Sequence, residues 1–186
     1  MRSHSQNSES FIVLGYFAGR RGTFLDIGAY DGLLFSNTYD LARAGWSGTL
    51  LEPHPEAYDM LHKNYIEFNN VRFYNIGIDE SSGEKTFYKC GLSSTLHEKL
   101  QRDGETYTPV TAKFSSWSEF ESMVGKRRYN FISIDAEGSD YSILLQMDLT
   151  ELGCECLCIE HNGDNDTLKF IESYCLDFGL TRIHCN

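Results

Sequence analysis

The sequence predicts an α/β fold in which helices cover both faces of a mostly parallel sheet. Three observations support this prediction. Short apolar runs that suit buried strands alternate with longer amphipathic runs that suit helices. Turn-forming residues, above all glycine, separate the two kinds of run. Polar and acidic residues collect directly after the apolar runs, as they do where parallel strands present their carboxyl ends to a ligand.

The first half of the chain divides into six expected elements. Gly19 and Gly22 break the opening helix, and the apolar run that follows them ends in a glycine turn, as a buried strand does. Pro55 suits the first turn of a helix, where no N–H is needed. In order, we expect a helix over 8–18, a strand over 23–27, a helix over 37–44, a strand over 48–52, a helix over 56–68 and a strand over 71–78.

The second half continues the alternation, and Gly179 is the expected stop of its longest helix. The expected elements are a strand over 84–89, a short helix over 96–102, a strand over 107–113, a helix over 116–124, a strand over 129–134, a helix over 141–147, a strand over 155–160, a helix over 166–178 and a last strand that begins over 180–184. The length of 186 residues, without repeats or linkers, suits one domain over 1–186. Residues 1–20 are expected to be a helical segment packed on it.

Composition excludes several classes of function. The net charge of −11 argues against binding to nucleic acid, because contacts with phosphates depend on lysine and arginine. The basic run 126–128 is interpreted as a solvated helix end. No stretch approaches the roughly 20 apolar residues that cross a bilayer, so no membrane contact is expected. The first ten residues lack the apolar region of a signal peptide, so we expect a cytoplasmic protein with reduced cysteines.

Three of the six cysteines, Cys154, Cys156 and Cys158, alternate along an expected strand. Alternate residues of a strand lie about 6.8 Å apart. Thiolates around one zinc ion, at about 2.3 Å from the metal, lie only about 4 Å from each other. A straight strand therefore cannot bring the three together, and small core residues are the better interpretation.

The segment after the first expected strand has the features of a nucleoside site. Glycines at 28 and 32 allow a sharp turn and the close approach of a ligand. Glu52 ends the next strand, where a carboxylate can accept hydrogen bonds from the hydroxyls of a ribose. The spacing is not the Gly-x-Gly-x-x-Gly of a pyrophosphate loop, and Asp26 and Asp31 would repel phosphates. A cofactor with a ribose, a cationic sulfonium and an amino-acid tail fits better, and S-adenosylmethionine has all three.

The chain resembles the FkbM family of methyltransferases over nearly its whole length. The resemblance rests on Phe24-Leu-Asp-Ile-Gly-Ala-Tyr-Asp-Gly32, Gly45-Trp-Ser-Gly48, Leu51-Glu-Pro-His-Pro55, Asn75-Ile-Gly-Ile-Asp79, Ser93-Ser-Thr-Leu96 and Phe131-Ile-Ser-Ile-Asp-Ala-Glu-Gly138. It implies a Rossmann-like, doubly wound and mostly parallel sheet of the class I methyltransferase type, and transfer of a methyl group to oxygen, often on sugars or natural products. One departure is that only one candidate strand follows residue 179, so the C-terminal hairpin usual in that class is expected to be incomplete.

The same resemblance implies where the cofactor binds. The methionine and ribose part of the cofactor would lie against Asp26, Gly28, Ala29, Tyr30 and Gly32. Asp31, in the same loop, is also expected to bind the cofactor. The resemblance also places Glu52 on the ribose hydroxyls, Pro53 and His54 beside the adenosine, and Gly77 and Ile78 near the adenine.

The proton of the acceptor needs a base, and two strand ends offer candidates. Asp135 follows one strand, where it can also touch the cofactor, and His161 follows another as a general base. Asp135 and Glu160 lie where similar acids of catechol O-methyltransferases hold Mg²⁺, which makes magnesium a second candidate cofactor. The alternatives are that Asp135 caps the following helix and that His161 is a structural hydrogen bonder.

The sequence therefore predicts an S-adenosylmethionine-dependent methyltransferase, with a hydroxyl on a sugar or other small molecule as acceptor. The alternatives are a relative that binds the cofactor without catalysis, and a nicotinamide-dependent oxidoreductase, which the glycine spacing opposes. The partner expected is a small-molecule or glycan acceptor. The sequence leaves the identity of this acceptor open, and the oligomeric state as well, a homo-oligomer included.

Overall fold

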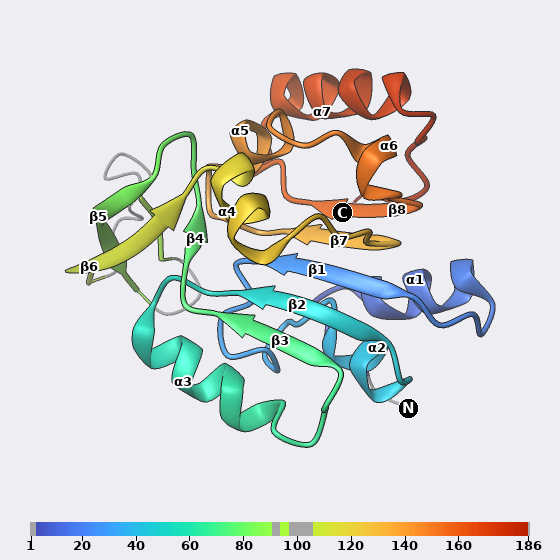
Figure 1. The fold of residues 1–186 in the computed structure, drawn as a ribbon. Coiled ribbons are helices and arrows are strands. Elements are labelled where there is room, and N and C mark those ends of the chain that lie inside the picture. The colour runs from blue at the N-terminus through green and yellow to red at the C-terminus, as the bar shows by residue number, and fades with distance from the viewer. Residues whose placement is uncertain (1–2, 91–93, 97–105, 186) are drawn as a thin grey trace.

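A five-stranded parallel sheet forms the centre of the computed structural model, which describes residues 3–90, 94–96 and 106–185 (Figure 1). The strands stand in the order β3-β2-β1-β7-β8. The chain therefore builds the sheet outward from β1 on one side and then returns to build the other side. The switch point lies between β1 and β7, where sheets of this kind bind ligands. The strands are β1 (Thr23–Ile27), β2 (Ser47–Leu51), β3 (Val71–Tyr74), β7 (Phe131–Ile134) and β8 (Cys156–Ile159).

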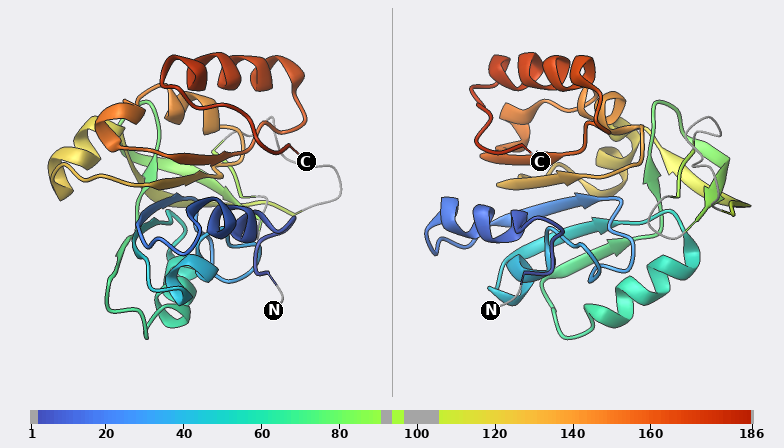
Figure 2. Two further views of the ribbon diagram at one scale, coloured as in Figure 1. Left: turned by 90° about the vertical axis from the view of Figure 1, so that its right-hand side faces the viewer. Right: turned by 180° about the vertical axis from the view of Figure 1, so that it is seen from behind.

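Helices cover both faces of this sheet, as Figures 1 and 2 show. One face carries α1 (Glu9–Phe17), α2 (Tyr39–Arg43) and α3 (Pro55–Asn64). The opposite face carries α4 (Trp117–Val124), α5 (Asp140–Leu144), α6 (Leu149–Leu152) and α7 (Asn165–Asp177). The predicted α/β fold with a doubly wound, mostly parallel sheet is confirmed.

Two hydrophobic cores result from the alternation of side chains along each strand. In β1, Phe24 packs into the core on the α1–α3 face, while Leu25 and Ile27 pack into the core on the α4–α7 face. All three side chains are buried. A strand that is covered on both sides needs an almost continuous apolar run, which is why β1 was recognisable in the sequence.

A smaller sheet stands at the carboxyl ends of the parallel strands (Figure 1). It consists of β4 (Gly77–Ile78), β6 (Thr108–Ser115) and β5 (Gly83–Lys89), with β6 in the middle. Phe87, Ala112 and Phe114 form its own small core. A Cβ at Gly77 would lie 2.3 Å from the ring of Phe114, so only glycine allows this approach.

Two of the expected strands are wrong. The run 71–78 is not one strand but two, β3 in the central sheet and β4 in the small one, because Asn75 turns the chain by donating to the carbonyl oxygens of Glu52 and Pro53. Residues 180–184 form no strand, and from 181 onward the described chain is exposed. The short helix α6 was not expected, and the predicted helix over 96–102 lies outside the described residues except for Leu96.

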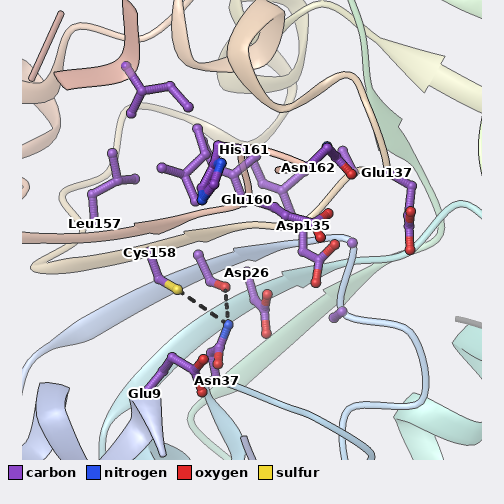
Figure 3. A pocket seen from close by; sticks show the side chains of 18 of the residues that line it. Glu9, Asp26, Asn37, Asp135, Glu137, Leu157, Cys158, Glu160, His161 and Asn162 are labelled. Atoms are coloured by element: carbon purple, nitrogen blue, oxygen red, sulfur yellow. Dashed lines mark hydrogen bonds between the residues drawn. The ribbon is translucent and has the colours of Figure 1, made fainter. Parts of the chain in front are cut away.

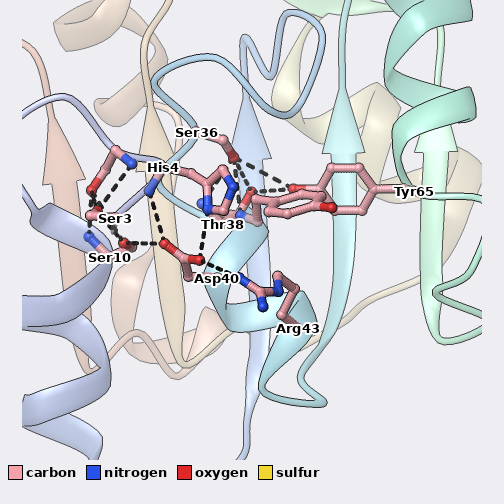
Figure 4. A network of polar contacts seen from close by, with 10 residues as sticks. Ser3, His4, Ser10, Ser36, Thr38, Asp40, Arg43 and Tyr65 are labelled. Carbon is pink, nitrogen blue, oxygen red and sulfur yellow. Dashed lines mark hydrogen bonds and ion pairs between the residues drawn. The ribbon is translucent and has the colours of Figure 1, made fainter. Parts of the chain in front are cut away.

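The N-terminal segment is held against α2 by a network of polar contacts (Figure 4). The carboxylate of Asp40 accepts hydrogen bonds from the backbone N–H of His4 at 3.0 Å and from the hydroxyl of Ser10 at 2.9 Å, and it lies 2.8 Å from Nδ1 of His4. In α1, the buried ring of Phe17 packs edge-on against Trp46. Within the described residues, the segment 3–17 is thus held by both polar and apolar contacts. No helix in the described ranges has the length and apolar character needed to cross a membrane.

Candidate active site

A cavity of about 1000 Å³ opens at the carboxyl ends of the parallel strands. Most of the residues singled out in the sequence line it, namely Asp26, Gly28, Ala29, Tyr30, Glu52, Pro53, His54, Gly77, Ile78, Asp135, Glu160 and His161. Asp31 and Gly32 do not line this cavity. The carboxylate of Asp31 instead accepts the backbone N–H groups of Leu33 and Leu34, which shapes the turn.

Gly28 lies at the switch point and brings two strand ends together. Its φ is +88°, and a Cβ there would lie 1.8 Å from the carbonyl oxygen of Asp135. The N–H groups of Gly28 and Ala29 both donate to the carbonyl oxygen of Leu51 at 3.0 Å. Tyr30 follows with a positive φ of 49°. The loop after β1 is therefore fixed by the ends of both neighbouring strands.

Glu52 holds the same loop from the end of β2. One carboxylate oxygen accepts the N–H of Tyr30 at 2.8 Å, and the other accepts the N–H of His54 at 2.7 Å. The side chain is buried, and this burial raises the pKa of Glu52 to about 7 despite the two hydrogen bonds. Each oxygen keeps a further lone pair that can accept a ligand hydroxyl.

Asp26 lies deeper in the cavity wall. The hydroxyl of Thr38 donates to its carboxylate at 2.6 Å. Burial raises the pKa of Asp26 to about 6, against the opposing effect of this hydrogen bond.

Asn37, which the sequence pattern did not single out, lines the cavity, and its side chain points toward β7 and β8 (Figure 3). Its side-chain amide donates to the hydroxyl of Ser133 at 3.2 Å and to the thiol of Cys158 at 3.6 Å. Glu9 of α1 lines the cavity on the same side. These polar groups come from four distant segments of the chain, so no local pattern in the sequence signals them.

Three carboxylates converge at the ends of β7 and β8. Oxygen atoms of Asp135, Asp140 and Glu160 lie within 4.8 Å of one another. Asp135 is exposed to water through the cavity. Its pKa is nevertheless raised well above the usual value, first because the surrounding protein disfavours the charged form. Neighbouring negative charges raise it further, and Glu160 contributes most among them. Asp135 therefore holds a proton more readily than a free aspartate does.

The same cluster bears on two predictions. Carboxylate oxygens are the ligands that Mg²⁺ prefers. However, both oxygens of Asp140 already accept backbone N–H groups, from Ala136 at 2.8 Å and from Gly138 at 3.0 Å. Binding of magnesium by this cluster therefore stays a prediction. Those two bonds hold the turn before α5, so Asp140 and not Asp135 fixes the start of that helix.

The two predicted catalytic residues lie on different sides of the sheet. In β8, Cys158 belongs to the core of the α1–α3 face, whereas Leu157 belongs to that of the α4–α7 face. Figure 3 shows His161 on the Leu157 side of β8, away from Asp26 and Asn37. Nε2 of His161 lies 3.7 Å from the thiol of Cys185.

The cysteines in and just before β8 pack against the two hydrophobic cores. Within the described part of the chain, the carboxylate cluster above is the one group with the spacing of metal ligands. Burial raises the pKa of Cys156 to about 11 and that of Cys154 to about 12, so both stay protonated thiols at neutral pH. They are half-buried, with Cys154 packed against the core on the α4–α7 face and Cys156 against the core on the α1–α3 face.

Comparisons with known proteins bear on the fold and the family. A structure of a Pyrococcus horikoshii protein, provisionally described as an RNA methyltransferase, is similar with a TM-score of 0.52 and 18% sequence identity, covering 95% of this chain and 69% of that one. At that identity the similarity shows the fold alone. A comparison with curated proteins found no match. Residues 26–179 match the methyltransferase FkbM domain, and the chain belongs to that family of methyltransferases.

Proposed function

We propose that the chain is an S-adenosylmethionine-dependent O-methyltransferase that acts on an uncharged hydroxyl compound, such as a sugar. The observation that carries the proposal is the anchored Glu52, whose carboxylate is held by the N–H groups of Tyr30 and His54 at the edge of the cavity. A carboxylate in this position supports binding of ribose hydroxyls. The backbone of Gly28 and Ala29, bare of large side chains, leaves room for the methionine part.

The charge of the cavity favours this cofactor over a nicotinamide dinucleotide. Carboxylates from several segments line it, among them Glu9, Asp26, Glu52, Asp135, Glu137 and Glu160. Among the described residues, Arg182 is the one arginine or lysine in the lining, and it pairs with Glu172 at 2.8 Å. Such a cavity attracts a sulfonium cation and repels a pyrophosphate. It likewise disfavours anionic acceptors, RNA included.

The rim of the cavity suits an acceptor of mixed character. Tyr16, Leu34 and Phe35 are exposed and line the opening. Apolar groups at the rim pack on the faces of sugar rings or on apolar parts of a natural product. The polar groups inside are mostly acceptors and so favour a ligand that donates hydroxyls.

Asp135 is the residue we assign to the reacting proton. When bound, S-adenosylmethionine supplies an activated methyl group on its sulfonium. With the cofactor bound, the Asp135 carboxylate would take the proton of the acceptor hydroxyl, and transfer of the methyl group from the sulfonium to that oxygen would leave a neutral thioether. The raised pKa makes the Asp135 carboxylate a stronger base than a free aspartate.

The cofactor proposal is tested by calorimetry with S-adenosylhomocysteine. We expect Glu52→Ala to weaken binding about tenfold or more, because the ribose loses its acceptor and the loop loses two hydrogen bonds. Glu56→Ala is the matched control, since Glu56 is exposed and its partner is Lys89 on the surface. Absence of binding to the unaltered protein, or equal binding by the Glu52 variant, would refute the proposal.

The acceptor is then sought by mass spectrometry with a panel of neutral sugars, amino sugars, phosphorylated sugars and RNA oligonucleotides. A mass gain of one methyl group on a neutral hydroxyl compound is the expected result. Transfer confined to RNA or to phosphorylated sugars would contradict the substrate class.

A further inference from the structure

The backbone of Phe35 is left-handed, with a φ of 58°, which is unfavourable for a bulky side chain. In the described part of the chain, six residues besides glycine have a positive φ, and four of them line the cavity, namely Tyr30, Phe35, Glu137 and Asn162. Three of these four stand three residues after the end of β1, β7 or β8, where the chain turns. Phe35 lies outside those turns, so its strain needs a separate explanation.

Packing within the protein does not account for a phenylalanine at this position. Phe35 is 46% exposed, and its side chain belongs to none of the hydrophobic cores that the described residues form. Asparagine or glycine would relieve the backbone strain here and would give up little buried apolar surface. The stability of the fold therefore favours a different residue, and the ring needs a reason outside the folded chain.

Contacts on both sides of Phe35 hold its ring in place. Before it, the carboxylate of Asp31 accepts the N–H of Leu34 at 2.8 Å. After it, the buried hydroxyl of Ser36 accepts the first N–H of α2 at 3.0 Å. The backbone of Phe35 itself pairs with that of Ser5 in an isolated parallel bridge. The ring is thus fixed at the mouth of the cavity before any ligand arrives, which reduces the entropy lost on binding.

A second hollow, of about 550 Å³, adjoins the cavity, and Phe35 and Leu34 line both. Asp135 lines the cavity but not this hollow, so Phe35 stands between the two. A ligand that is apolar on its faces and polar at its edges fits an exposed ring beside polar groups, and the rings of sugars have this character. The other residues of the hollow are mostly polar: Ser3, His4, Ser5, Gln6, Ser8, Asp31 and Leu33.

We propose that Phe35 is an acceptor-binding residue, whose ring packs against a sugar ring that is linked to the one being methylated. This inference rests on the proposed function, because it takes a sugar acceptor with its reacting hydroxyl at Asp135. A ligand that reaches from Asp135 to Phe35 and the hollow beyond spans more than one ring. The acceptor is therefore an oligosaccharide or a glycoside of several units, and Phe35 selects it over a free monosaccharide. The strained backbone holds the aromatic ring where this second sugar lies.

Three variants separate this role from others. Phe35→Asn removes the ring and introduces a residue that tolerates left-handed backbone. Phe35→Tyr keeps both the ring and the strain. Ile66→Asn is the matched control, because Ile66 is an apolar residue with 70% exposure that lines neither the cavity nor the hollow.

Each protein would be studied by thermal unfolding and by calorimetry with S-adenosylhomocysteine. Its binding to an array of neutral monosaccharides and oligosaccharides would then be measured with and without S-adenosylhomocysteine.

We expect Phe35→Asn to raise Tm by about 2–4 °C, because the strain is relieved. It should bind S-adenosylhomocysteine and monosaccharides unchanged, and oligosaccharides about tenfold more weakly, because the stacked ring is lost. Phe35→Tyr and Ile66→Asn should bind oligosaccharides as the unaltered protein does. A residue that only supports the fold would not combine a higher Tm with weaker ligand binding.

Other results would overturn the inference. They are a lower Tm of Phe35→Asn, unchanged binding of oligosaccharides by that variant, and loss of monosaccharide and oligosaccharide binding by the same factor. Binding of S-adenosylhomocysteine without binding of any saccharide would also overturn it, while the cofactor proposal stands. If S-adenosylhomocysteine does not bind, the cofactor proposal fails by itself, and the array without it still decides the role of Phe35.

Discussion

Gly28 carries no side chain at the point where β1 and β7 come closest. The Cβ of Gly28→Ala would collide with backbone, the carbonyl oxygen of Asp135 at 1.8 Å, which cannot rotate away. We expect a loss of about 3 kcal/mol in the free energy of unfolding, measured by urea denaturation, together with loss of S-adenosylhomocysteine binding.

Gly179→Ala is the control for this prediction. Its φ of +76° is similar, but nothing lies within 4 Å of the position that its Cβ would take. It should cost only the backbone strain, about 1 kcal/mol. If the free energy of unfolding decreases equally in the two variants, the close approach at Gly28 does not contribute to stability.

Asp135 and His161 offer a second comparison between single residues. Because the pKa of Asp135 is raised, its ionised form becomes populated only as pH increases through that value, and methyl transfer should increase with it. Asp135→Asn should reduce kcat by roughly 10²-fold or more while S-adenosylhomocysteine still binds. His161→Gln should change kcat only a few-fold, since His161 lies on the other side of β8. The reverse order would assign the base to His161.

The residues that the sequence revealed are those with a local signature. Gly28 and Glu52 were recognisable because a glycine turn or an acid follows a buried strand directly. Asn37 and Glu9 were not, since their place in the cavity depends on α1 and β8 packing against the loop after β1. The opposite placement of Asp135 and His161 follows from strand alternation, which can be applied only once the register of β7 and β8 is known.

At the scale of elements, the apolar pattern predicted nearly every helix and strand but not their assignment to sheets. The run 71–78 is mostly apolar, with Arg72 and Asn75 as its polar residues, because β3 and β4 are each packed in a sheet. Alternation does not reveal the turn between them. Leu180 suggested a further strand by its apolar character. It packs instead against the core that α7 covers, and the exposed residues after it lack the buried face that a strand needs.

The attachment of the N-terminal segment to α2 depends on one buried carboxylate. Burial raises the pKa of Asp40, but the hydrogen bonds from His4 and Ser10 outweigh it and lower the pKa overall. Asp40→Asn would place an amide N–H against these donors, which costs about 2–3 kcal/mol. We expect amide hydrogen exchange within 4–17 to become faster, while β1 and β2 keep their protection.

Two results decide this prediction. Asp59→Asn, at an exposed position of α3, should leave the exchange pattern unchanged. Uniformly faster exchange over the whole chain would mean that Asp40 contributes to global stability and not to a local attachment.

For the whole molecule, the buried acids of the cavity set how stability depends on pH. Asp26 and Glu52 have pKa values of about 6 and about 7 in the folded protein, above the values of 3.8 and 4.5 for the free groups. The folded state therefore binds protons more tightly than the unfolded state, and stability decreases as pH increases through this range. We expect Tm to be higher at pH 5 than at pH 7.5 by several degrees, equivalent to about 4 kcal/mol.

Asp26→Asn should reduce that difference in Tm, because one of the two titrating groups is gone. Saturating S-adenosylhomocysteine should also reduce it, since a ligand that favours ionised Glu52 offsets the cost of its charge. A Tm that increases steadily from pH 5 to pH 7.5 would contradict the burial of these acids.

The strand order also has a consequence for synthesis on the ribosome. The central strand β1 hydrogen-bonds with β7, and the side chain of Asn130 just before β7 accepts the N–H of Thr23 across 107 positions of sequence. When the first ninety residues have emerged, only β3, β2 and β1 can associate, and one edge of β1 stays open until β7 arrives. A nascent chain in this state exposes an unpaired apolar strand and is prone to aggregate. Residues that follow β7, such as Asp135, line the cavity. We therefore expect a ligand to bind only after that edge has closed, so that binding would stabilise the finished protein but not the incomplete chain.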